Sequence, residues 1–265
     1  MLRRAGTLLV IALLSMPCQA LAGAWTLDKN TGQIILTGTL SQANEVFDSA
    51  RQIASTPRYN KFELGPLLEY GFTDRFTFML NPGFQHIDVA PPFSGSRTGQ
   101  GYTDVGGRYK ILEGDTWVFS GQVELNLPGT SQTANPAAIG YTDTEVDVRA
   151  LFGKSFTING LASFIDLEIA ERFRFGDPPD EFRFDATFGV RLNPQWQLLA
   201  QTFSVFSEGA GTGPFFTSYD YHKLQLSAVY NITPNFAIQV GGFTTFSGRN
   251  ALQENGLVTA IAYKF

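Results

Sequence analysis

The stretch FRFDATFGVRL, residues 182–192, alternates along its whole length between an apolar face and a polar face. The apolar face carries Phe182, Phe184, Ala186, Phe188, Val190 and Leu192, and the other carries Arg183, Asp185, Thr187, Gly189 and Arg191. Because successive side chains of a β-strand point to opposite faces, this pattern predicts a strand with one apolar and one charged face. Its length matches the roughly 9–11 residues with which a tilted strand crosses a membrane, apolar side outward.

The same alternation recurs along the rest of the chain, and helical periodicity is absent. The predicted strands centre on residues 32–42, 60–71, 76–88, 101–112, 116–127, 142–154, 161–174, 182–192, 196–207, 219–231, 236–247 and 255–265. Bacterial single-chain barrels have an even number of strands. The sequence therefore predicts an all-β fold, a transmembrane antiparallel up-and-down β-barrel of about 12 strands.

The predicted connections alternate between short and long. The short turns lie at 73–75, 113–115, 157–160, 193–195 and 233–235, and the longer connections at 48–57, 90–99, 129–140, 175–181 and 208–217. Outer-membrane barrels have short periplasmic turns and longer outer loops, so both termini are expected at the periplasmic side. The loops 90–99 and 129–140 are the candidates for a gate or lid.

The first 22 residues are typical of an export signal. Two arginines precede a short apolar run, and Ala20-Leu21-Ala22 is a small-x-small cleavage site. The apolar run of about ten residues is too short for a spanning helix, which needs roughly 20. Lipidation at Cys18, the only cysteine, is disfavoured by the proline before it. We expect a cleaved signal peptide at 1–22 and an outer-membrane barrel at 23–265.

Composition narrows the expected partners. Removing the two signal arginines from the 19 basic residues leaves 17 against 24 acidic ones, a net charge of −7 that disfavours nucleic acid. Many of the 36 aromatic residues (24 Phe, 9 Tyr and 3 Trp) gather at predicted strand ends, as in the girdles that contact lipid headgroups. The alternating C-terminus ending in Phe265 resembles the signal read by the barrel assembly machinery. We expect no cofactor and no metal.

The alternation also assigns charged side chains to the lumen. Ten acids and nine bases fall on inward positions, and a lipid-facing Arg or Lys would cost about 2–4 kcal/mol at the midplane. The expected solute-lining residues are Asp147, Arg149, Glu168, Arg172, Arg183, Asp185, Arg191, Phe164 and Phe243. The first, ninth, eleventh and twelfth strands carry mostly neutral inward residues, so the lumen should have one charged and one neutral wall. Two alternatives stay open: charges that cross-link and close a narrow barrel, or an ion-paired ladder that lines a small pore.

Enzymatic function is the less favoured hypothesis. The two histidines, His86 and His222, both fall near the outer girdle, and neither lies in a segment resembling the histidine-serine motif of outer-membrane phospholipases. An interfacial histidine that replaces an aromatic residue is the simpler interpretation. A lipid-modifying enzyme that uses one of them remains the third hypothesis.

Two segments resemble a known group of barrels. They are similar to motifs of the outer-membrane proteins named for the meta-cleavage pathway of phenol degradation. The first is Tyr70-Gly71-Phe72-Thr73-Asp74-Arg75-Phe76, and the second is Gly101-Tyr102-Thr103-Asp104-Val105-Gly106-Gly107-Arg108-Tyr109-Lys110. Trp117, Leu127-Pro128-Gly129 and the turn at Asn231–Phe236 extend the resemblance. It implies passive transport of small amphipathic or aromatic solutes, with no catalytic residues carried over. The alternative is a closed structural or surface-interaction barrel.

Overall fold

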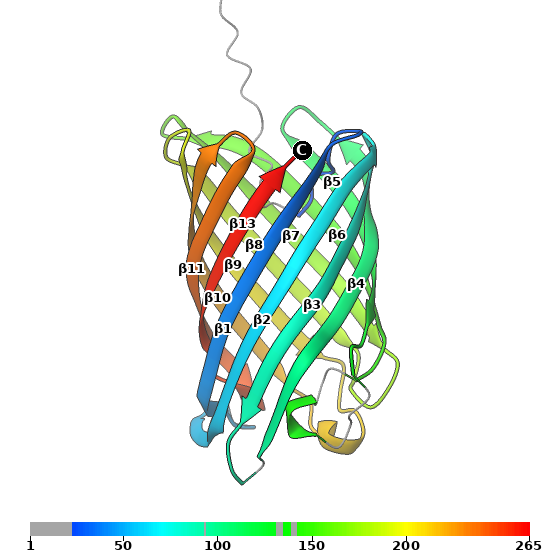
Figure 1. Cartoon of the computed structure of the whole chain (residues 1–265), viewed down its shortest axis with the longest axis vertical. Helices are drawn as coiled ribbons and strands as arrows, with labels where there is room; N and C mark the ends of the chain where they lie inside the picture. The colour runs from blue at the N-terminus through cyan, green and yellow to red at the C-terminus, as the bar shows by residue number, and fades with distance from the viewer. Residues whose placement is uncertain (1–22, 93, 131–134, 139–141) are drawn as a thin grey trace, which may run out of the picture.

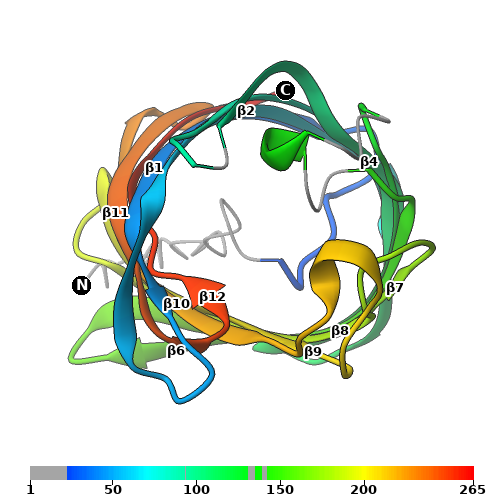
Figure 2. The ribbon, with the colours of Figure 1, turned by 90° about the horizontal axis from the view of Figure 1, so that it is seen from below.

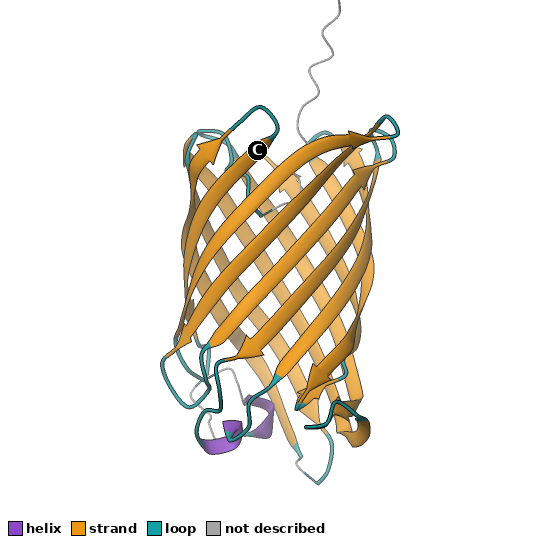
Figure 3. Cartoon of the chain, turned by 180° about the vertical axis from the view of Figure 1, so that it is seen from behind, coloured by secondary structure: helices purple, strands orange, loops and turns teal. Residues whose placement is uncertain are grey.

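The computed structural model describes residues 23–92, 94–130, 135–138 and 142–265, and these form a closed antiparallel barrel of tilted strands (Figure 1). The strands are β1 (Gly32–Phe47), β2 (Ile53–Thr73), β3 (Phe76–Val89), β4 (Gly95–Glu113), β5 (Trp117–Leu127), β6 (Glu145–Ile158), β7 (Leu161–Arg174), β8 (Glu181–Arg191), β9 (Trp196–Ser207), β10 (Asp220–Thr233), β11 (Phe236–Arg249), β12 (Ala251–Leu252) and β13 (Asn255–Lys264). Two short 3₁₀ helices, η1 (Pro136–Ala138) and η2 (Gly213–Phe215), lie at one end (Figure 3). No helix in the described residues is long and apolar enough to span a membrane.

Each strand pairs with its neighbour in the chain, and β1 closes the barrel against β13. The closing ladder runs without interruption from Gln33 opposite Lys264 to Gln42 opposite Asn255. Because β12 is a two-residue strand that only extends the outer end of β1, the wall consists of twelve strands. The predicted fold class is confirmed, and each predicted segment lies on one wall strand.

The prediction of long connections at 48–57 and 90–99 is wrong. β2 already begins at Ile53 and β4 at Gly95, so each of these connections is about five residues long. The ladders continue outward through Phe47 opposite Ile53 and Val89 opposite Gly95. Neither extension, IASTPRY at 53–59 or GSRTGQ at 95–100, alternates regularly between apolar and polar residues, so both lack the pattern that marks a strand in lipid. Hydrogen bonding between strands does not require that pattern.

The outer face of the barrel is apolar. Exposed large hydrophobic side chains occur on every one of the twelve wall strands, among them Leu36, Val123, Leu167, Leu226 and Ile261. Aromatic rings contact each other at the end that holds the short turns, where Trp196 lies 4.8 Å from Tyr230 and Tyr263 6.3 Å from Phe265. This is the arrangement of a lipid-facing wall with an interfacial aromatic girdle.

The two ends of the barrel differ as the sequence predicts. The turn end holds the tight turns and the C-terminus, and the loop end holds the connection between β5 and β6, which is the longest (Figures 1 and 3). The predicted loop 129–140 lies partly outside the described residues, as does the signal segment 1–22. By the architecture of this class, the turn end faces the periplasm.

The segment before β1 does not leave the barrel. Residues 23–31 run inside it, as the view along the barrel shows (Figure 2). Ala24 is fully buried, and Trp25 packs against an apolar cluster that gathers inward side chains of β1, β7, β9, β10, β11 and β13. We name residues 23–31 the inner segment.

Candidate functional site in the lumen

The charged wall predicted from the sequence is an ion-pair network on β6, β7 and β8. Arg149 lies at its centre, with Nη1 2.6 Å from Glu168 and 2.7 Å from Asp185, and Nε 3.3 Å from Asp147. Arg172 continues the network toward the loop end, 3.2 Å from the same Asp147. Charge-assisted bonds of this kind hold both partners in fixed positions.

Four further residues complete the network. Arg174 lies 2.7 Å from Glu145, and Glu181 accepts from both Arg174 and Arg183. Glu145 and Arg174 are inward positions of the alternating pattern. Glu181 was not predicted to face the lumen, because it lies where β8 begins, at the boundary with the preceding loop.

All these pairs join residues on one strand or on strands one or two places apart, so the network runs along the wall. The opposite neutral wall faces it across a cavity of about 390 Å³. This cavity is lined by Thr37 and Thr39 of β1, by residues of β2 to β5 that include Glu63 and Asp104, and by Arg172 of β7. The two walls predicted from the sequence therefore enclose a common space.

A smaller cavity of about 160 Å³ lies nearer the loop end and is partly aromatic. Phe243 and Phe203 line it together with Lys61, Lys223 and Glu254. The ammonium of Lys223 lies 5.5 Å from the centre of the Phe243 ring and also pairs with Glu254. Burial raises the pKa of Glu254, which lies in the connection before β13, but Lys61 and Lys223 outweigh it and hold this pKa below its usual range. This part of the lumen offers an aromatic face next to charge.

The inner segment narrows the turn-end half of the lumen. Arg108 of β4 donates to the Trp25 carbonyl at 3.1 Å, and Ser120 of β5 donates to the Ala24 carbonyl at 2.6 Å. Asp166 of β7 accepts from the Ala24 N–H at 2.7 Å. The segment is thus bonded to strands far from β1, to which it is covalently joined.

Two of the expected lining residues, Phe164 and Arg191, lie beside the inner segment and line the same turn-end cavity. Phe164 points inward but is only 4% exposed, because Trp25 covers it with ring centres 6.0 Å apart at 89°. Arg191 lies outside the ion-pair network and lines this cavity of about 530 Å³ beside the inner segment. Both therefore face the inner segment, which strand alternation alone could not reveal.

The histidines occupy the outer girdle. The ring of His222 contacts Phe206 edge-on and Phe246 at a tilt, with ring centres 5.2 and 6.1 Å away. Its Nδ1 lies 2.9 Å from the Ser204 hydroxyl, but its Nε2 is 3.9 Å from Asp220, beyond hydrogen-bond distance. The geometry favours the interfacial interpretation.

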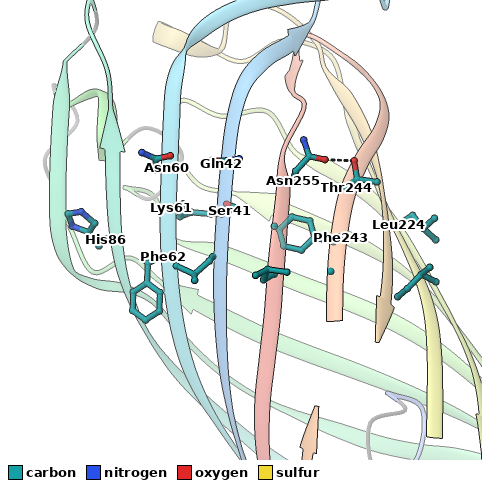
Figure 4. A pocket seen from close by; sticks show the side chains of 15 residues that line it. Ser41, Gln42, Asn60, Lys61, Phe62, His86, Leu224, Phe243, Thr244 and Asn255 are labelled. Carbon is teal, nitrogen blue, oxygen red and sulfur yellow. Dashed lines mark hydrogen bonds between the residues drawn. The ribbon is translucent and has the colours of Figure 1, made fainter. Parts of the chain in front are cut away.

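A groove of about 920 Å³ follows the outside of the barrel over β1, β2, β10, β11 and β13 (Figure 4). Outward apolar side chains, including Leu40, Phe62 and Leu224, form most of it. Thr244 and Asn255 are hydrogen-bonded to each other at 2.8 Å on its rim. Its lining is mostly the lipid-facing wall, but Lys61 and Phe243, which also line the 160 Å³ cavity of the lumen, border it as well.

Residues 83–261 match the model of the family described as MetA-pathway of phenol degradation. The chain belongs to this family. The expected family is thereby confirmed: the match includes the motif at 101–110 and extends over β4 to β11 and most of β13, whereas the motif at 70–76 lies outside it. A sequence search among curated proteins gives no significant match.

Solved structures with the same architecture are known. An outer membrane channel from Pseudomonas putida F1 superposes with a TM-score of 0.74 at 14% identity, covering 91% of this chain and 98% of that one. The NanC porin gives 0.56 at 10% identity, covering 88% of this chain and 100% of that one. At such identities these structures show a common fold, that of outer-membrane barrels.

Proposed function

We propose that this family member is a passive outer-membrane channel for small amphipathic or aromatic solutes. The observation that carries the proposal is the cavity between Arg172 on the charged wall and Thr37 and Thr39 on the neutral wall. Because the ion pairs run along the wall instead of across the lumen, they do not fill this space, and Arg172 is the member of the network that lines it.

The chemistry of the lumen favours solutes with both a polar and an apolar part. A carboxylate or hydroxyl group finds arginine and threonine donors in the larger cavity, and an aromatic ring finds Phe203 and Phe243 nearer the loop end. The structure from Pseudomonas putida F1 is described as a channel, and this supports a transport role here.

The lining role of the charged wall can be tested by conductance. The refolded chain should give discrete single-channel currents in a planar bilayer, and small aromatic acids should block them more strongly than aliphatic alcohols. Arg149→Gln leaves Glu168, Asp185 and Asp147 in excess, so the reversal potential in a salt gradient should shift toward cation selectivity. Arg149→Lys, which keeps the charge, should restore most of the parent value.

Arg51→Gln is the matched control. Arg51 is also paired with an aspartate, Asp220, but it belongs to the connection between β1 and β2. Its loss should leave selectivity unchanged. A well-folded barrel with no conductance in any variant would instead favour the second candidate, a closed surface barrel. That candidate has one observation in its favour, the inner segment packed into the turn-end half of the lumen.

A further inference from the structure

Asp166 is a buried carboxylate without a cation. It points into the lumen from β7 and is 1% exposed, and it accepts the Ala24 N–H at 2.7 Å. In the described part of the chain, no lysine or arginine lies within 4 Å of it. A buried charge of this kind is costly unless an opposite charge offsets it.

Glu168, the next inward residue on β7, increases this deficit. Its Oε2 lies 2.6 Å from Arg149, but the same guanidinium also serves Asp147 and Asp185. Three inward carboxylates, Asp147, Glu168 and Asp185, thus share the one guanidinium of Arg149, while Arg172 pairs with Asp147 and Glu145. Among the described residues no lysine or arginine pairs with Asp166, and Arg149 contacts Glu168 at Oε2 and not at Oε1.

Gly23 lies next to Glu168 Oε1. A Cβ added to this glycine would lie 2.0 Å from Glu168 Oε1 and 3.4 Å from Leu151, so a side chain there would have to displace the Glu168 carboxylate. The Cβ and the nitrogen of one residue are about 2.5 Å apart by covalent geometry. The Gly23 nitrogen therefore lies within about 4.5 Å of Glu168 Oε1, and it is the neighbour of the nitrogen bound to Asp166.

We propose that export processing before Gly23 creates the missing cation, an α-ammonium group held by Asp166 and Glu168. A signal peptidase adds water across the Ala22–Gly23 amide: the acyl carbon of Ala22 takes the hydroxyl, and the released Gly23 nitrogen takes the proton. An α-amino group has an ordinary pKa of about 7.7–8.0, so two adjacent carboxylates keep it charged at neutral pH.

The consequence is that processing and the seating of the inner segment are one event. Before cleavage the Gly23 nitrogen is a neutral amide and cannot offset either carboxylate. After cleavage it is an ammonium group that can pair with Asp166 and Glu168 at the start of the inner segment. This inference rests on the proposed cleavage site and does not depend on solute transport.

The first test is the N-terminus itself. Intact mass of the chain extracted from outer membranes should correspond to a start at Gly23, and a start at any other residue would overturn the proposal. In the folded protein the Gly23 amine should react with an amine-specific label at pH 7 roughly tenfold or more slowly than in the urea-unfolded chain. Equal labelling rates would also overturn it.

The second test separates the ionic contact from mere packing. Refolded chains that begin at Gly23 are compared with the same chains acetylated at the α-amine, by the temperature at which the barrel loses its compact gel mobility. Acetylation should lower this temperature in the parent but not in the Asp166→Asn/Glu168→Gln double variant. Asp104→Asn, a lumen carboxylate held instead by Asn81 and Asn126, should respond like the parent. An equal effect of acetylation in parent and double variant would show that no ion pair exists.

Discussion

Trp25→Ala should open the turn-end half of the lumen. The indole of Trp25 packs edge-on against Phe164 and fills the space over Gly153, whose missing Cβ would lie 2.5 Å from the ring. A tryptophan buries about 150–250 Å² when fully covered. Since Trp25 is only half-buried, we take roughly 100 Å² as the area lost.

At about 25 cal/mol per Å² this area corresponds to ~2.5 kcal/mol of docking free energy. Each 1.4 kcal/mol changes an equilibrium tenfold, so the undocked fraction of the inner segment should rise by roughly 60-fold. The hydrogen bonds of Ala24 to Ser120 and Asp166 remain, so the segment should exchange between docked and undocked positions instead of leaving the lumen.

The assay is single-channel recording of the refolded variant in a planar bilayer. We expect larger and longer open events than in the parent, with a barrel that still shows heat-modifiable gel mobility. Trp196→Ala is the matched control, because Trp196 is an exposed girdle residue that packs on Tyr230 and should leave conductance unchanged. Parent-like currents in Trp25→Ala, from a correctly folded barrel, would refute the inference that the inner segment limits passage.

Three further outcomes follow from the wall and its connections. Gly153→Val should displace the Trp25 ring and reproduce the conductance rise of Trp25→Ala; unchanged currents would show that the ring has room to shift. Leu226→Arg puts a charge on the lipid face and should lower the free energy of unfolding in vesicles by about 2–4 kcal/mol, whereas Gln225→Arg, on the lumen face, should cost much less. Lys61 and Lys223 hold the pKa of Glu254 below its usual range despite burial. The ion pairs of Glu254 should therefore stabilise the barrel at neutral pH, and this stabilisation should be lost as the pH falls through that lowered pKa. Glu254→Gln should remove this part of the acid sensitivity in urea titrations, and an unchanged pH profile in the variant would contradict the prediction.

The strand pattern was predictable because burial in lipid acts on every residue of a strand. Leucines and phenylalanines must face out and charges must face in, so a period of two shows where each strand lies and how it is oriented. The same constraint located Arg149, Arg172 and Asp185 in the lumen. It stops acting above the membrane, which is why the outer extensions of β2 and β4 were assigned to loops.

The inner segment could not be predicted in this way. Residues 23–31 have no alternation, and nothing in a local pattern says that a short irregular segment turns back into a barrel. Its position depends on contacts with Arg108, Ser120 and Asp166, which lie about 80 to 140 residues away in the chain. The one local signal was Trp25, an aromatic residue placed before the first strand where no girdle position requires it.

The path of the inner segment has a mechanical consequence. It leaves β1 at Gly32 and is hydrogen-bonded at Ala24 to β5 and β7, on the far side of the barrel (Figure 2). A closed sheet resists stretching along its hydrogen bonds but flattens easily, because flattening needs only small changes in strand twist. Because the inner segment is joined to two opposite walls, it opposes that deformation. This barrel should therefore keep a round cross-section under lateral membrane pressure as long as the inner segment stays bonded to β5 and β7.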